Sequence, residues 1–271
     1  MPFATSPIRI SEGRLLVLSD LHLPFEDTRA VELAAAVADD FKPTHLILNG
    51  DVWDAMPVSP FPVPVRERVR LAEQVDAVSR KLRKLIDRLG FADKPVIFIE
   101  GNHELWWIRY IQRRAQELEG LPQLTIPSIL SLPDNIQYLP HIVGYRSIGQ
   151  SAAPEVVAGA LHIMHGDTVR LGAQLVNVAR TICMRMGVPT LVGHWHVCQE
   201  YLATTYDGRV QAAWASGALV LPRAAYNSGR IAQQGIATVT VSGKTFECSV
   251  IPFWHESSRI ACFYAGKRYI K

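Results

Sequence analysis

The sequence lacks the features that would place the chain in a membrane or outside the cell. No apolar run approaches the roughly 20 residues of a membrane-spanning helix. The N-terminus has no basic region followed by an apolar core, so no signal peptide is expected. The four cysteines show no Cys-x-x-Cys spacing, which argues against a disulfide framework and a structural zinc knuckle. We therefore expect a cytoplasmic protein with reduced thiols and no membrane partner.

An excess of one charge and internal repeats are also missing. The net charge of +3 is small, so it permits a polyanionic partner without predicting one. Apolar residues make up 48% of the chain and charged residues 20%, a balance typical of globular proteins with a buried core. No low-complexity tract or linker divides the sequence. We predict a single domain over residues 1–271; a homo-oligomer is compatible with the sequence but cannot be read from it.

Short apolar runs alternate with helical patterns along the first two thirds of the chain. The runs predict buried strands at 15–18, 46–48, 96–99, 161–164 and 190–192. Apolar residues at helical spacing predict helices at 27–41, 65–89, 104–118 and 173–186. From Tyr201 onward, turn signals at Asp207-Gly208 and Ser242-Gly243 predict a β-hairpin region over 200–255. This order predicts a layered α/β or α+β domain.

Two segments between the predicted elements have unusual compositions. Prolines at 57, 60, 62 and 64 exclude a helix interior and a central strand, so residues 56–64 are predicted to be a semi-extended surface loop. The helix predicted over 65–89 carries many arginines and lysines on its polar face. Such a face is usually solvated, and contact with a nucleic-acid backbone is the alternative.

Five strand-like runs end in residues that can bind metals. The clusters are Asp20-x-His22, Asp51-x-x-Asp54, Asn102-His103, His165 and His194-x-His196, and they hold five of the nine histidines. One aspartate after a strand is often only a helix cap, but scattered histidines have no reason to collect at strand ends. Carboxylate, imidazole and amide ligands without thiolates suit manganese, iron or zinc. In each pair, alternate residues of an extended segment point the same way and can reach one metal environment.

In this order the blocks resemble the calcineurin-like metallophosphoesterase superfamily. Asp-x-His, Gly-Asp-x-x-Asp, Gly-Asn-His-Glu, His and Gly-His-x-His are all present between Asp20 and His196. The resemblance implies a mixed α/β fold: a four-layer sandwich of two mixed β-sheets flanked by helices. It also implies a phosphoester hydrolase whose dinuclear metal centre activates a bridging hydroxide.

The resemblance also assigns roles to individual residues. Asp51 would bridge two metals, with further ligands from Asp20, His22 and His196 on one side and from Asn102, His165 and His194 on the other. We expect Mn²⁺, with Fe, Zn, Ni or Mg as alternatives. His103 would stabilise or protonate the leaving oxygen, and Asp54 would orient its imidazole. The alternative for this pair is a structural role beside the ligands.

The sequence gives conflicting signals about the substrate. Ala55-Met56 stand where phosphoprotein phosphatases of the superfamily carry Arg-Gly, so a phosphate-binding guanidinium is missing. Glu104, however, is a residue that those phosphatases share. An edge of tryptophans and arginines follows Asn102-His103, and it is either a helix with aromatic core contacts or a nucleotide-binding edge. We predict a phosphodiesterase for nucleotides, DNA or RNA, with substrate contacts from Asn102, Trp106 and Arg109. The alternatives are a phosphomonoesterase for a small molecule or protein, and a non-catalytic metal-stabilised binding module.

Overall fold

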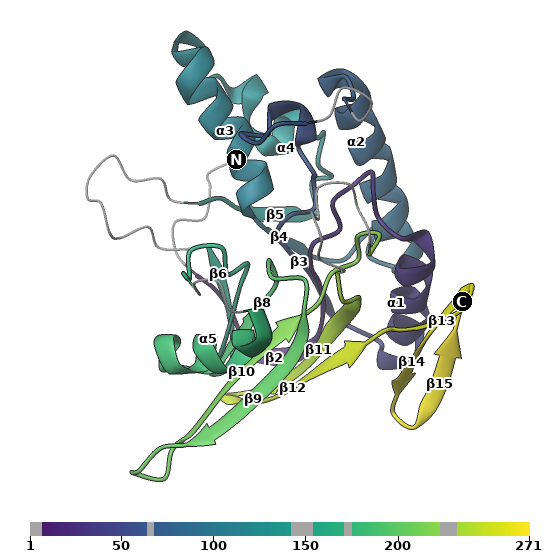
Figure 1. Ribbon diagram of the computed structural model, residues 1–271, viewed down its shortest axis with the longest axis vertical. Coiled ribbons are helices and arrows are strands. Elements are labelled where there is room, and N and C mark those ends of the chain that lie inside the picture. The colour runs from purple at the N-terminus through teal and green to yellow at the C-terminus, as the bar shows by residue number, and fades with distance from the viewer. Residues whose placement is uncertain (1–6, 64–67, 142–153, 171–174, 223–231) are drawn as a thin grey trace.

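Two six-stranded mixed sheets form the centre of the computed structural model, which describes residues 7–63, 68–141, 154–170, 175–222 and 232–271 (Figure 1). The first sheet has the order β12 (Thr245–Pro252), β11 (Gly235–Ser242), β2 (Glu12–Leu18), β3 (His45–Asn49), β4 (Val96–Ile99), β5 (Ile136–Leu139). The second has the order β1 (Ile8–Ile10), β6 (Glu155–Ala158), β7 (Leu161–Met164), β8 (Thr190–Val192), β10 (Val210–Ser216), β9 (Cys198–Thr204).

The central strands are apolar throughout because both of their faces are buried. In β2, Leu15 and Val17 pack between the two sheets, whereas Leu16 and Leu18 pack against the helices. Side chains alternate across a strand, so a run without polar positions belongs to a sheet covered on both sides. All four of these side chains are fully buried.

Helices cover the outer face of each sheet. Helices α1 (Thr28–Phe41) and α2 (Leu71–Arg88) pack on the first sheet, and α5 (Val178–Met186) packs on the second (Figure 1). Helix α3 (Asn102–Arg114) and the short α4 (Ile126–Ile129) join the core of the first sheet. This confirms the predicted fold class.

Three predicted helices are shorter in the structure. Helix α2 begins at Leu71 because Arg70 is extended, and α3 ends at Arg114, where Ala115 leaves the helical region with φ −154°. Helix α5 begins at Val178, after the 3₁₀ turn Leu175–Asn177. The predicted positions 65–67 and 173–174 lie outside the described residues. Helical spacing of apolar residues predicted each helix correctly, but it did not predict these ends.

The C-terminal part contains more structure than the sequence predicted. The two predicted hairpins are present as β9–β10 and β11–β12. A third sheet follows, made of β13 (Trp254–Glu256), β14 (Arg259–Tyr264) and β15 (Lys267–Ile270). The predicted hairpin region, 200–255, did not include this third sheet. Ile260, Cys262 and Tyr269 on the covered face of this sheet belong to the core that α1 also joins.

The parallel strands bring their carboxyl ends to one edge of each sheet. Strands β2, β3, β4 and β5 are mutually parallel, as are β7, β8 and β10. Loops after parallel strands are where open α/β sheets build their sites. No helix in the described ranges combines the length and hydropathy needed to span a bilayer.

Candidate metal centre

Two groups of predicted ligands meet at this edge. Asp20, His22 and His196 form one group, and Asp51, His165 and His194 form the other; within each group the ligand atoms lie within 4.8 Å of one another. Asn102, the remaining predicted ligand, joins the second group, with Oδ1 3.3 Å from His165 Nε2. The structure thus brings together side chains from five separate segments.

The distances within the groups fit ligands arranged around a cation. His196 Nε2 lies 3.1 Å from Asp20 Oδ1 and 3.2 Å from His22 Nε2, and His165 Nε2 lies 3.2 Å from Asp51 Oδ2. Ligands about 2.1 Å from a metal are separated by roughly 3.0–3.4 Å in octahedral or tetrahedral geometry. Two imidazole nitrogens at this distance can share a proton in a hydrogen bond, and the same spacing suits two ligands of one cation. The buried Nδ1 of His194 has no hydrogen-bond partner among the described residues, which also fits a ligand position.

Each carboxylate is held by one oxygen and presents the other. Asp20 Oδ2 accepts hydrogen bonds from Ser19 Oγ at 2.6 Å and from the His194 amide at 2.8 Å, which leaves Oδ1 facing the imidazoles. Asp51 Oδ1 accepts from the His103 amide at 2.9 Å, which leaves Oδ2 free to face His165. A hydrogen bond to one oxygen of a carboxylate fixes the direction in which its other oxygen can bind a metal.

The backbone of the ligand loops is not extended, contrary to the prediction. Asp20, His22, Asp51, His194 and His196 all have positive φ, between 46° and 62°. Non-glycine residues in this region cost about 1–3 kcal/mol each and gather at functional sites. As a result, His194 and His196 do not share one environment: each joins a different group. Tight turns at the strand ends, rather than strand alternation, therefore aim these side chains.

Asp54 contacts two different histidines of the site. His103 Nδ1 lies 2.6 Å from the backbone carbonyl oxygen of Asp54, not from its carboxylate. The carboxylate Oδ2 instead lies 3.4 Å from His22 Nδ1. The Asp54 side chain therefore contacts His22, and orientation of His103 by the Asp54 carboxylate stays a prediction. His103 Nε2 lies 3.8 Å from Asp51 Oδ2.

Glu104 has a role that the sequence did not reveal. It is fully buried, and its carboxylate accepts three backbone hydrogen bonds: from Asp51 at 3.1 Å, Trp53 at 2.7 Å and Gly101 at 2.9 Å. The side chain therefore joins the loop after β3 to the start of α3. Glu104 faces the backbone, so it gives no information about substrate class. The reach from N3 of α3 back to the Gly101 amide, half of a capping box, was the available signal.

We expect Glu104→Gln to destabilise the protein and weaken metal binding. An amide NH₂ would then face backbone N–H donors, and an unsatisfied buried donor costs about 1–3 kcal/mol. Urea unfolding with and without Mn²⁺ measures both effects. Glu117→Gln, at an exposed position, is the matched control. Equal stability of the two variants would refute this role.

The ionisable groups respond to one another as a metal-free site should. Burial alone would lower the pKa of His165, but the charge of Asp51 outweighs it and raises the pKa well above its usual value. Burial and the His165 charge lower the pKa of His194 to about 4. Burial and the Asp51 charge raise the pKa of Asp54 to about 8.

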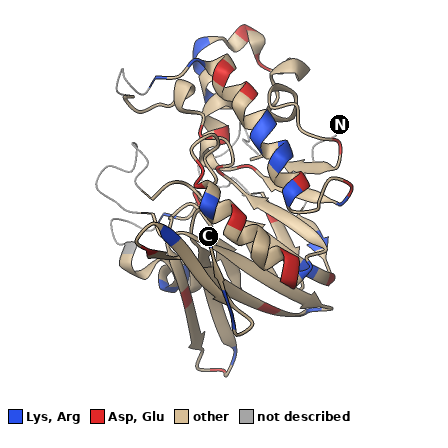
Figure 2. Ribbon diagram, turned by 90° about the vertical axis from the view of Figure 1, so that its right-hand side faces the viewer, with Lys and Arg blue, Asp and Glu red and all other residues tan. Residues whose placement is uncertain are grey.

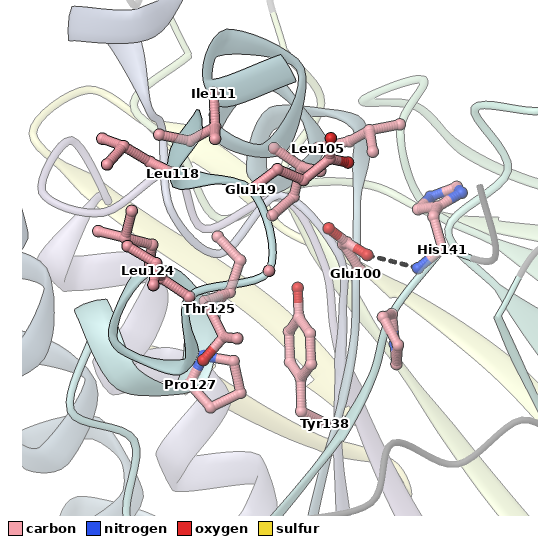
Figure 3. Close-up of a pocket in the computed structure, with 15 residues that line it drawn as sticks. Glu100, Leu105, Ile111, Leu118, Glu119, Leu124, Thr125, Pro127, Tyr138 and His141 are labelled. Atoms are coloured by element: carbon pink, nitrogen blue, oxygen red, sulfur yellow. Dashed lines mark hydrogen bonds between the residues drawn. The ribbon is translucent and has the colours of Figure 1, made fainter. Parts of the chain in front are cut away.

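A mostly apolar cavity of about 330 Å³ lies beside the centre, between α3, β5 and α4 (Figure 3). Glu100 and Tyr138 point towards one another at its base, and Glu100 accepts a hydrogen bond from the His141 amide. Burial raises the pKa of Glu100 to about 8. His141 Nε2 lies 3.5 Å from Asp167 Oδ1, so this histidine is packed into the structure. None of these residues belongs to a predicted metal block.

The predicted substrate residues occupy different places. Asn102 lies with the Asp51 group, and the Trp106 ring stacks on the imidazole of His103, with centroids 3.8 Å apart. Arg109 is exposed one turn further along α3. Trp107, by contrast, is buried in the core. The burial of Trp107 agrees with a helix that makes aromatic core contacts, and the nucleotide-binding edge stays a prediction.

Comparison with known proteins identifies the family. A sequence profile described as calcineurin-like phosphoesterase matches residues 13–198, more than half of the chain. The chain belongs to this family, so it is a phosphoester hydrolase of a metal-dependent family. The gene 54 protein of Mycobacterium phage L5 is 24% identical over 251 residues, covering 88% of this chain and 93% of the phage protein.

Solved structures resemble the chain more distantly. Vacuolar protein sorting 29 from Cryptosporidium parvum has a TM-score of 0.43 and 13% identity, covering 96% of each chain. The nuclease MPE of Pseudomonas putida has a TM-score of 0.31 and 15% identity, covering 95% of this chain and 87% of that chain.

Proposed function

We propose that the chain is a metal-dependent phosphodiesterase that acts on nucleotides or nucleic acid. The observation that carries this proposal is the position of His103. Its imidazole lies between Asp51, at the meeting point of the two ligand groups, and the exposed edge of Trp106. A substrate whose phosphate reaches Asp51 would therefore extend across aromatic and basic side chains.

Two divalent ions, most simply Mn²⁺, would be held by the two groups, with Asp51 as the ligand that they share. Asp20, His22 and His196 would hold one ion, and Asn102, His165 and His194 the other. When bound, such ions lower the pKa of water and neutralise charge on phosphate oxygens. The mixed oxygen and nitrogen donors without thiolates agree with manganese, and the four unpaired cysteines agree with a reducing cytoplasm.

His103 would act on the leaving oxygen, and the backbone carbonyl of Asp54 would fix its tautomer. An Nδ1–H that donates to this carbonyl leaves Nε2 on the side of Asp51. A protonated imidazole could then give a proton from Nε2 to the departing oxygen. A diester needs such help, because its leaving group is an alkoxide of high pKa.

The residues that follow Asp51-x-x-Asp54 favour diesters over monoesters as substrates. Ala55 and Met56 are both buried, so no guanidinium stands where phosphoprotein phosphatases of the superfamily carry one. A phosphomonoester carries more negative charge than a diester and gains more from a bidentate arginine. Without this arginine, less of the negative charge of a phosphomonoester would be neutralised.

Hydrolysis of a matched pair of chromogenic esters tests this proposal. With Mn²⁺ we expect a higher kcat/KM on bis-p-nitrophenyl phosphate than on p-nitrophenyl phosphate. A short oligonucleotide should also be cleaved. Preference for the monoester, with no cleavage of the oligonucleotide, would contradict the proposal and leave a phosphomonoesterase.

A further inference from the structure

A groove of about 310 Å³ runs along α3, separate from the apolar cavity on the other side of that helix. The loop 57–60 forms one wall, and Trp106, Arg109, Tyr110, Arg113 and Arg114 of α3 form the other. The first part of the proline-rich segment therefore lies beside α3, and Met56–Val58 form a 3₁₀ turn there instead of the semi-extended loop that the sequence predicted.

The groove begins at the candidate catalytic histidine. Trp106, in its wall, stacks on His103, and the two planes are inclined by 29°. From His103 to Arg113 the helix advances ten residues, which is about 15 Å at 1.5 Å per residue. A ligand that leaves the metal centre along α3 would thus meet the tryptophan first and the arginines afterwards.

The arginines of the groove lie at the surface of the described part of the chain. Arg109, Arg113 and Arg114 are exposed, and none makes an ion pair with any residue that the structure describes. Positive charges gathered on one helix face repel one another unless an anion lies between them. These three guanidiniums therefore favour a ligand with several negative charges.

The basic helix α2, by contrast, uses part of its charge internally. Lys81 lies 2.6 Å from Glu26, and Arg88 lies 3.1 Å from Glu32 on α1. Acidic and basic segments lie side by side on the face of α1 and α2 (Figure 2). The sequence indicated two basic surfaces, one on α2 and one after Asn102-His103, and the arginines that line this groove belong to the second, on α3.

Exposed aromatic rings accompany the arginines. Phe61 is 66% exposed and lies 5.8 Å from the Trp106 ring, and Tyr110 is 43% exposed. Exposed rings beside unpaired arginines are what single-stranded nucleic acids use, with bases stacking on the rings and phosphates contacting the cations. In a duplex the base faces are covered by neighbouring bases, so the rings would have nothing to stack on.

We propose that this groove binds a single-stranded stretch of polynucleotide next to the phosphate to be cleaved. Phosphates would contact Arg109, Arg113 and Arg114, and bases would stack on Phe61 and Tyr110. The roughly 15 Å between His103 and Arg113 spans a few nucleotides of a strand whose bases are free to stack on these rings. This inference rests on the proposed function, because the strand enters the groove from the phosphodiester at the metal centre.

Paired charge reversals on the two basic helices test the proposal. Fluorescence anisotropy with a labelled dT₁₂ oligonucleotide, in EDTA to prevent cleavage, compares Arg113→Glu/Arg114→Glu with the matched control Arg80→Glu/Lys84→Glu. Arg80 and Lys84 are exposed on α2. We expect at least a tenfold loss of affinity for the α3 variant and little change for the control. Two lost phosphate contacts should lower the slope of log K against log salt by about 2 × 0.7, or about 1.4.

Two further comparisons test whether bases stack on Tyr110 and whether the groove prefers a single strand to a duplex. Tyr110→Ala should weaken dT₁₂ binding about tenfold, whereas Tyr206→Ala, at an exposed position on the hairpin between β9 and β10, should not. A duplex of the same length should bind more weakly than dT₁₂. Equal binding of duplex and single strand, or equal losses in both charge-reversal variants, would overturn the proposal.

The outcome separates this proposal from the proposed function. If the wild-type protein hydrolyses bis-p-nitrophenyl phosphate but the α3 variants bind dT₁₂ as the wild type does, only the groove is wrong. If α3 binds the oligonucleotide but the protein cleaves only monoesters, the groove stands and the phosphodiesterase assignment fails. If both hold, the α3 variants should lose more kcat/KM on an oligonucleotide than on the small diester.

Discussion

Asp51→Asn is expected to remove nearly all hydrolysis and to lower the metal content from two ions per chain to one or none. The amide oxygen can still accept the hydrogen bond from the His103 amide, so the loop should keep its conformation. The neutral NH₂ that replaces Oδ2 cannot bind cations on both sides. We expect a loss of roughly a thousandfold in kcat/KM, about 4 kcal/mol of transition-state stabilisation. Activity on bis-p-nitrophenyl phosphate and elemental analysis measure the two effects.

Asp76→Asn is the matched control for this variant. Asp76 is exposed on α2, so the same chemical change should leave activity and metal content as in the wild type. An Asp51→Asn protein that keeps two ions per chain and turns over normally would refute the bridging position of Asp51. Loss of folding would show as a changed urea transition of the metal-free protein, which separates it from loss of metal.

His103→Ala should lower kcat by about 10²–10⁴-fold while both metals stay bound. The loss should grow as the leaving group becomes more basic, because His103 would supply a proton to it. A series of aryl esters with leaving groups of different pKa measures this dependence. His255→Ala, at an exposed position in β13, is the matched control.

Metal content decides between two readings of His103. His22, Asp51 and His103 also form a group whose ligand atoms lie within 4.8 Å of one another. If His103→Ala lost an ion, His103 would be a ligand rather than a proton donor. A uniform loss of rate across leaving groups would also count against proton donation. Asp54→Asn should behave in the opposite way: its carbonyl still contacts His103, but the altered contact with His22 should weaken metal affinity about 10–100-fold.

The sequence predicted the layers and the residues that meet at the sheet edge. Apolar runs such as Leu15–Leu18 identify strands buried on both faces, and the polar residues after parallel strands are forced to one edge. Asp20 and Asp51, which follow the neighbouring strands β2 and β3, could therefore be placed together before any coordinates; His165 follows β7 of the other sheet and was placed with them by the family resemblance. The histidines gathered at the strand ends gave a chemical reason for this proximity, because imidazoles and carboxylates together can bind a metal.

The sequence did not predict the side-chain directions that are set by turns, because a strand pattern carries no information about them. The left-handed backbone at His194 and His196 separates two histidines that strand alternation would have placed together. The carboxylate of Asp54 turns to His22, and Glu104 binds backbone amides, because both directions depend on turns between elements. Helix ends and the groove beside α3 likewise depend on contacts between segments distant in the sequence.

Anomalous diffraction at the manganese edge, from crystals of the Mn²⁺-loaded protein, tests the account most directly. It predicts two peaks about 3.5–4 Å apart, one on each side of the Asp51 carboxylate. Asp20, His22 and His196 should surround one peak, and Asn102, His165 and His194 the other. A single peak, or two peaks that do not share Asp51, would contradict the assignment of these five chain segments to one dinuclear centre.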